Sequence, residues 1–107
     1  MLPYVHIPDL TAAMPDIPSD SILSRTLYED EQVKATLFAF AAGQELTEHT
    51  ASHPAIIHFL KGEADLTLEK DTSRAQPGTW VYMSAQLSHS ISAKTPMTML
   101  LLLLKQG

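Results

Sequence analysis

Short runs in which apolar and polar residues alternate are the feature that most limits the fold of this chain. The run ADLTLE at 64–69 alternates strictly, and related strand-like runs stand at 33–40, 55–60, 79–83, 89–93 and 97–104. Successive side chains of a strand point to opposite faces, so alternation indicates half-buried strands rather than helices. Segments such as EKDTS at 69–73 and QPG at 76–78 carry residues typical of turns. The pattern therefore predicts an all-β fold, a small antiparallel barrel or sandwich.

The N-terminal part of the chain has a different pattern, because Pro3, Pro8, Pro15 and Pro18 interrupt it. Proline lacks a backbone N–H and breaks both helices and central ladders. We therefore expect residues 1–26 to form an extended segment, within the same domain or at a dimer interface. Residues 27–107 are expected to form the barrel, since a chain of 107 residues suits a single domain.

The run at 97–104 reads MTMLLLLL, and its five final leucines do not alternate with polar residues. A strand that is apolar on both sides needs cover on both faces. The barrel interior covers one face, and a second copy of the chain is the simplest cover for the other. The sequence therefore predicts a homodimer.

Composition and charge exclude several functional classes. The chain has no cysteine, which excludes disulfides, thiolate zinc sites and cysteine nucleophiles and favours a cytoplasmic location. A formal net charge of −5 disfavours binding to nucleic acid or to an anionic membrane, because neither would meet a basic surface. The N-terminus does not resemble a signal peptide, and the apolar run at 99–104 is too short to span a bilayer. A small-molecule ligand or a protein partner remains.

Two groups of glycine and histidine residues stand at spacings known from one protein family. In the first, five residues separate Gly43 from His49, and Gly62 follows; in the second, Gly78 precedes His89. These spacings resemble the two motifs of the cupin superfamily, and the chain resembles a small single-domain cupin with a degenerate first motif. The resemblance covers residues 43–93, about half of the chain. It implies an antiparallel β-barrel of the RmlC-like jelly-roll type.

The resemblance also implies where a metal would bind, because cupins hold it with two histidines and a glutamate of the first motif and a histidine of the second. His49 and His89 occupy two of these positions, whereas Ala51 and Ala55 replace the other histidine and the glutamate. Two imidazoles hold a metal only weakly, since zinc and non-haem iron sites use three or four protein ligands. The second motif departs at three further positions: Ser84, Gln86 and Ala93.

A third metal ligand would have to come from elsewhere, and His53 is the first candidate. A straight strand would place His53 about 13 Å from His49, so it reaches the site only if the residues around it form a turn. A β-bulge could instead re-aim Glu45 or Glu48 toward the site. The candidate metal ligands are therefore His49, His89 and His53. They would bind a divalent ion weakly, with water as its remaining ligands.

Alternation assigns the faces of the run at 55–60. If Ala55 points inward like the glutamate it replaces, Ile57 and Phe59 point inward and His58 points outward, to a sheet surface or a subunit interface. Ile57 and Phe59 would then line a pocket beside the two motif histidines. Such a pocket is mostly apolar with two convergent polar groups, as small-molecule sites usually are.

Two aromatic residues share one face of the run at 79–83. Trp80 and Tyr82 are two positions apart, so their side chains point the same way along a strand. We expect both to pack in the core.

Three functions are compatible with these features, and none assigns a catalytic residue. The first is a binding module that holds a small molecule beside His49 and His89 without turnover. The second, implied by the resemblance, is a metal-dependent enzyme of the oxygenase or isomerase kind. The third is an interaction protein with a vestigial pocket, in which the two imidazoles are hydrogen-bonded core residues.

Overall fold

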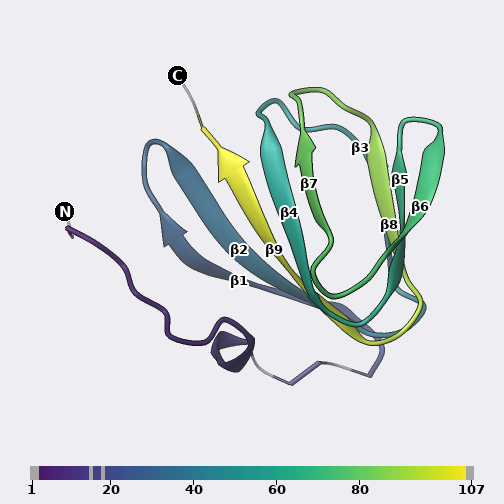
Figure 1. The fold of residues 1–107 in the computed structure, drawn as a ribbon, viewed down its shortest axis with the longest axis horizontal. Helices are drawn as coiled ribbons and strands as arrows, with labels where there is room; N and C mark the ends of the chain where they lie inside the picture. The colour runs from purple at the N-terminus through teal and green to yellow at the C-terminus, as the bar shows by residue number, and fades with distance from the viewer. Residues whose placement is uncertain (1–2, 15, 18, 106–107) are drawn as a thin grey trace.

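The computed structural model describes residues 3–14, 16–17 and 19–105, which form two β-sheets facing each other (Figure 1). A short 3-10 helix, η1 (Thr11–Ala13), precedes the strands. No helix in these ranges is long and apolar enough to cross a membrane. The strands are β1 (Ile22–Glu29), β2 (Val33–Phe40), β3 (Glu45–His49), β4 (Ala55–Lys61), β5 (Ala64–Leu68), β6 (Asp71–Ala75), β7 (Trp80–Met83), β8 (His89–Ala93) and β9 (Met97–Leu104).

The sheet topology confirms the predicted all-β fold of the jelly-roll type. One sheet has the strand order β1-β2-β9-β4-β7 and the other has the order β3-β8-β5-β6. Every pairing in these two sheets is antiparallel. From β2 onward the chain changes sheet at each connection except that between β5 and β6. Within the described residues no ladder joins the two sheets, so the barrel is open along its sides.

The predicted runs at 33–40, 89–93 and 97–104 coincide with β2, β8 and β9. Two strands differ from the sequence prediction. β1 begins at Ile22, inside the segment predicted as an extended leader, and β6 covers residues predicted as a turn. Both are edge strands with mostly exposed side chains, so neither carries an apolar alternation. Backbone pairing with β2 and with β5 holds them in place.

The core lies between the two sheets. The predicted faces of β4 are confirmed, because Ala55, Ile57 and Phe59 are 1–3% exposed whereas His58 is only partly buried. Ile57 and Phe59 belong to one contiguous cluster that also holds Phe40, Leu66, Met83, Ile91, Met97 and Met99. The space between the sheets is therefore occupied by packed side chains.

The outer face of the five-stranded sheet is apolar as well. Met97 and Met99 of β9 point into the core, so alternation turns Leu100, Leu102 and Leu104 to the outer side, where they are partly buried. β9 is thus apolar on both sides, as the sequence predicts.

The two aromatics of β7 also lie on this outer face. Trp80 and Tyr82 are 59% and 51% exposed, so the prediction that they pack in the core is wrong. Val81 and Met83 contact the core instead. Since neighbouring residues of a strand face opposite sides, this turns both aromatics outward.

Two motif glycines occupy turns that require a positive φ. Gly62, after β4, has φ +77°, and Gly78, before β7, has φ +98°. A Cβ added to Gly62 would lie 2.2 Å from the carbonyl oxygen of Pro96, whereas a Cβ added to Gly78 would have nothing within 4 Å. The two positions therefore share the backbone requirement but differ in steric room.

We expect Gly62→Ala to lower the free energy of unfolding by more than Gly78→Ala does. Either alanine must adopt a left-handed backbone at a cost of about 1–2 kcal/mol, and only the first also overlaps the backbone at Pro96. Urea denaturation followed by circular dichroism measures both losses. Equal losses would contradict the close approach of Gly62 to Pro96.

Candidate functional site

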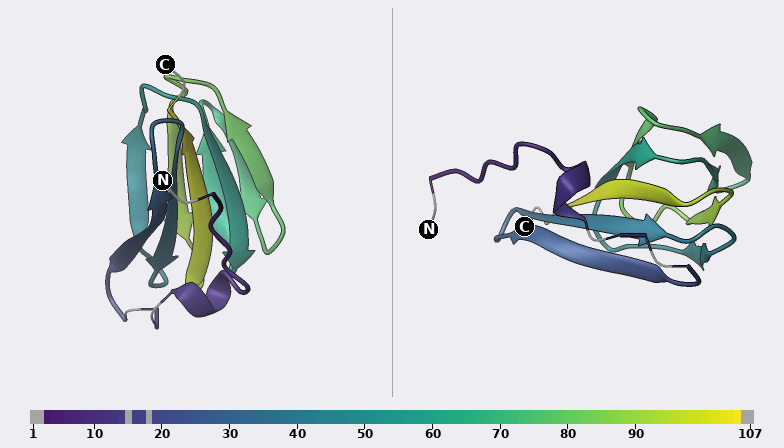
Figure 2. Two further views of the ribbon diagram at one scale, coloured as in Figure 1. Left: turned by 90° about the vertical axis from the view of Figure 1, so that its left-hand side faces the viewer. Right: turned by 90° about the horizontal axis from the view of Figure 1, so that it is seen from below.

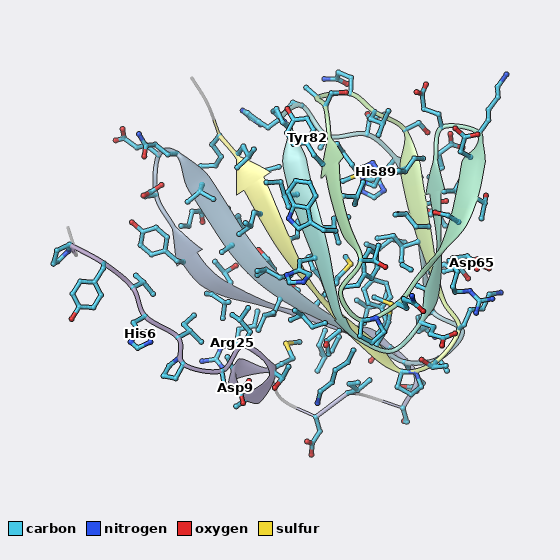
Figure 3. All side chains as sticks on the ribbon, in the orientation of Figure 1. His6, Asp9, Arg25, Asp65, Tyr82 and His89 are labelled. Carbon is cyan, nitrogen blue, oxygen red and sulfur yellow. The ribbon has the colours of Figure 1, made fainter. Side chains whose placement is uncertain are left out.

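His49 and His89 lie against each other on neighbouring strands. They are register partners in the pairing of β3 with β8. Their ring centroids are 4.2 Å apart, with the ring planes inclined by 57°. His89 points into the space between the two sheets (Figure 3). The fold thus brings together the two motif histidines, which are distant in the sequence.

A β-bulge in β3 positions His49. Leu46 pairs with Ile91, and His49 pairs with His89. Between these two pairs, β3 therefore contains one residue more than β8 does. Leu46 packs against the core. Without the irregularity, a residue three positions later would point to the opposite face. A bulge is thus present in this strand, and it re-aims His49 rather than Glu45 or Glu48.

Backbone carbonyls fix the tautomer of both imidazoles. His49 Nδ1 lies 2.8 Å from the carbonyl oxygen of Thr47, and His89 Nδ1 lies 2.9 Å from that of Leu87. A carbonyl oxygen only accepts hydrogen bonds, so each Nδ1 carries the proton and donates. In the neutral ring each Nε2 then holds a free lone pair. Sequence reasoning missed these two partners, because backbone atoms leave no mark in the residue pattern.

The histidine pair is accessible from one side only. His89 is 7% exposed and pairs with Leu68 of β5, whereas His49 is exposed. Leu46, Leu68 and Leu87 are partly buried and pack against the core. The pair therefore has one buried member, His89, and one member open to solvent, His49.

The other two predicted pocket residues are part of the packed core. Ile57 and Phe59 are each 1% exposed and contribute to the contiguous core cluster. Their side chains point inward as predicted, but they offer almost no accessible surface to a ligand. The accessible part of the candidate site is therefore His49.

The donor set does not fit the metal site that the fold family implies. Ala55, in the place of the glutamate, faces inward and is 3% exposed. His53 does not form a group with His49 and His89. Its Nδ1 lies 3.0 Å from the hydroxyl of Ser52. Among the described residues, no group of three or more His, Asp or Glu side chains could hold a metal ion.

The two nearby glutamates do not complete the site either. Glu48 accepts a hydrogen bond from the hydroxyl of Ser88, and Glu45 is exposed. Both border a surface groove of about 220 Å³ that is also lined by Ser90 and Ser92. These carboxylates therefore belong to the surface of the β3–β8 pair.

Comparison with known proteins gives relatives of the same fold. No family model matches the chain, and no curated protein matches it. The chain is 30% identical to a conserved protein of unknown function, SPY1581, from Streptococcus pyogenes, with a TM-score of 0.85 over 99% of this chain and 92% of that one. It is 25% identical to a cupin superfamily protein from Desulfitobacterium hafniense, with a TM-score of 0.86 over 98% and 95% of the two chains.

A third relative is an enzyme. The DMSP lyase DddQ from Ruegeria pomeroyi is 22% identical, with a TM-score of 0.73 over 78% of this chain and 47% of that one. At this identity the likeness concerns the fold alone. The paired motifs, the jelly-roll topology and the full-length likeness to a cupin agree, and this chain belongs to the cupin superfamily.

Proposed function

We propose that this protein binds a small molecule at the open side of the histidine pair. The observation that carries the proposal is that both imidazoles use Nδ1 in the same way and lie against each other. Both Nδ1 atoms are committed to backbone carbonyls, and the rings are 4.2 Å apart. Each of the two neighbouring rings therefore keeps one Nε2 lone pair that the backbone carbonyls do not use. With no cysteine in the chain, we also place the protein in the cytoplasm.

The chemistry of the pair defines the class of ligand. Two acceptor nitrogens select a molecule with hydrogen-bond donors, such as hydroxyl or amine groups, on one side. Leu68 is the register partner of His89, and this partly buried leucine favours an apolar portion in the ligand. A small hydroxylated compound with a hydrophobic portion satisfies both requirements.

A metal-dependent enzyme is the second candidate, since the same two lone pairs suit a divalent cation. Histidines that bind metals usually donate their other ring N–H to an oxygen, as His49 and His89 do. With Ala51 and Ala55 in place of two ligands, however, binding would be weak. We assign no reaction step to such an ion.

We expect small hydroxylated compounds to raise the melting temperature of the protein, because a ligand that binds only the folded state stabilises it. His49→Ala and His89→Ala should abolish the shift. His53→Ala is the matched control and should leave it unchanged, because His53 stands apart from the pair. A shift that survives in both pair variants would place the ligand elsewhere.

The same variants separate a binding site from a structural role. Removing a hydrogen-bonded core imidazole leaves its partner unsatisfied, at about 1–3 kcal/mol. If the parent binds no compound while either pair variant loses that much stability in urea denaturation, the two histidines are structural. The protein would then be an interaction protein with a vestigial pocket.

Restoring the missing ligands should raise metal affinity sharply. In Ala51→His with Ala55→Glu, two donors return to the positions at which the cupin motif carries metal ligands. Calorimetric titration with Zn²⁺ should show a gain of about a hundredfold or more over the parent, about 2.7 kcal/mol of binding free energy. Ala51→His with Ala55→Gln is the control and should gain less, because it lacks the carboxylate. No gain in either variant would contradict the motif alignment.

We further propose that the protein is a homodimer, supported by the apolar outer side of β9. Light scattering at micromolar concentration should give a mass near twice the 11.8 kDa of one chain. The mass of a single chain would contradict the proposal.

A further inference from the structure

Two residues other than glycine have a positive φ in the part of the chain that the structure describes. They are Glu69, with φ +56°, and Gln86, with φ +69°. A side chain disfavours this left-handed backbone, because its Cβ comes too close to the following carbonyl oxygen. Residues that their surroundings hold in such a conformation cluster at functional sites. Each of the two positions therefore needs a physical explanation.

The strand connection explains the backbone of Glu69. β5 ends at Leu68 and β6 begins at Asp71, and these two residues are register partners. A two-residue hairpin loop of this kind favours a positive φ at its first central position. The backbone of Glu69 thus follows from the hairpin and requires no further cause.

No hairpin explains Gln86, because β7 and β8 belong to different sheets. The loop between them, residues 84–88, begins with a turn in which the Leu87 amide donates to the Ser84 carbonyl over 3.3 Å. Gln86 is the third residue of this turn, and Ala85, the second, does not share its positive φ. This is the pattern of a type II turn, whose third position ordinarily carries glycine or asparagine. The turn therefore holds a glutamine in a conformation that suits glycine.

The same loop contacts the surroundings of both imidazoles. The carbonyl oxygen of Leu87 accepts the hydrogen bond of His89 Nδ1 over 2.9 Å. The hydroxyl of Ser88 donates to the carboxylate of Glu48, the residue before His49. The loop is thus bonded to one imidazole directly and to the strand that carries the other.

The backbone amide of Gln86 joins this loop to the connection between β3 and β4. It donates a hydrogen bond of 2.8 Å to the carbonyl oxygen of Ala51, two residues after His49. The two connections lie at the same end of the sheets, at the top of Figure 1 and of the left-hand view in Figure 2. The side chain of Gln86 is exposed. The contact of this residue with the other connection is therefore made by its backbone.

From these contacts we infer that Gln86 is a positioning residue of the histidine pair and acts through its left-handed backbone. The turn directs its amide to Ala51 and brings the carbonyl of Leu87 to His89 Nδ1. The second contact keeps the proton on Nδ1, so the Nε2 lone pair of His89 stays free. The inference rests on the proposed function, since a free acceptor nitrogen has a use only where a ligand donates to it. It adds that the 84–88 loop sets the preference for such ligands.

Substitutions that differ in their tolerance of a positive φ test this assignment. Gln86→Val should disturb the turn, because a β-branched residue rarely adopts this backbone. Gln86→Gly and Gln86→Asn should preserve it, since glycine and asparagine adopt it readily. Ala85→Val is the matched control, because it places the same side chain one residue earlier, where φ is not positive.

The tautomer of His89 is the direct readout. Long-range proton–nitrogen correlation spectra at about pH 8, where free histidine is neutral, show which ring nitrogen carries the proton. A His89→Gln sample identifies the signals. We expect the Nδ1–H form in the parent, Gln86→Gly, Gln86→Asn and Ala85→Val, and its loss in Gln86→Val. Retention of this form in Gln86→Val, an equal loss in Ala85→Val, or its absence from the parent would overturn the inference.

Ligand binding gives a second readout, with 1,2-hexanediol as the probe because it joins two hydroxyl groups to an alkyl chain. We expect this diol to raise the melting temperature of the parent and of Gln86→Gly alike. Gln86→Val should bind it about tenfold more weakly, as is typical when the group that orients a site histidine is lost. Weak binding by Gln86→Gly with an unchanged His89 tautomer would overturn the assignment to the backbone, because the glutamine side chain would then contact the diol.

The two readouts separate this inference from the proposed function. A parent that shows no shift with the diol would count against the proposed function, whereas the tautomer comparison needs no ligand and still decides the positioning role. Circular dichroism of each variant checks that the β-sheet content is retained. If Gln86→Val does not fold, Gln86→Thr replaces it, since threonine is also β-branched but suits an exposed position. The Nδ1–H form in Gln86→Thr would then overturn the inference.

Discussion

The packing of the two sheets against each other is the constraint on which the rest of the structure depends. Phe40, Phe59 and Met99 of one sheet are at most 1% exposed within this core. Because side chains alternate along a strand, fixing one inward residue assigns the face of every other. The same rule directs Ala55 inward, His58 outward and the aromatics of β7 away from the core.

Alternation also explains why the site has its present composition. A carboxylate at the position of Ala55 would be buried at 3% exposure, which is costly unless a cation compensates it. Alanine removes that requirement, so the side chain at this position needs no cation. His49 and His89 need no cation either, because backbone carbonyls satisfy one nitrogen of each. The pair keeps its geometry while the strong ligand set is gone, which favours a neutral ligand over a tightly held ion.

The sequence predicted those parts of the fold that have a side-chain pattern. β2, β8 and β9 have buried alternating or continuous apolar faces, whereas the exposed edge strands β1 and β6 rely on backbone pairing and left no such signal. The proximity of His49 and His89 followed from the motif spacing, but the bulge that re-aims His49 did not. Trp80 and Tyr82 were assigned to one face correctly and to the wrong side, because alternation does not say which face the core covers.

The two faces of β4 connect the candidate site with the outer face of the five-stranded sheet. Ala55 and Ile57 of β4 point toward the core. The alternate residues, Ile56 and His58, point to the outer side, where they pair with Tyr82 and Trp80. The backbone of β4 that carries Ala55 on its inner side is thus paired on one edge with the exposed aromatics of β7 and on the other with the leucines of β9. β7 ends at Met83, opposite Ala55, and leads within a few residues to Leu87, whose carbonyl orients His89. The strand that exposes Trp80 and Tyr82 on its outer side is therefore joined directly to the loop that fixes one of the two imidazoles.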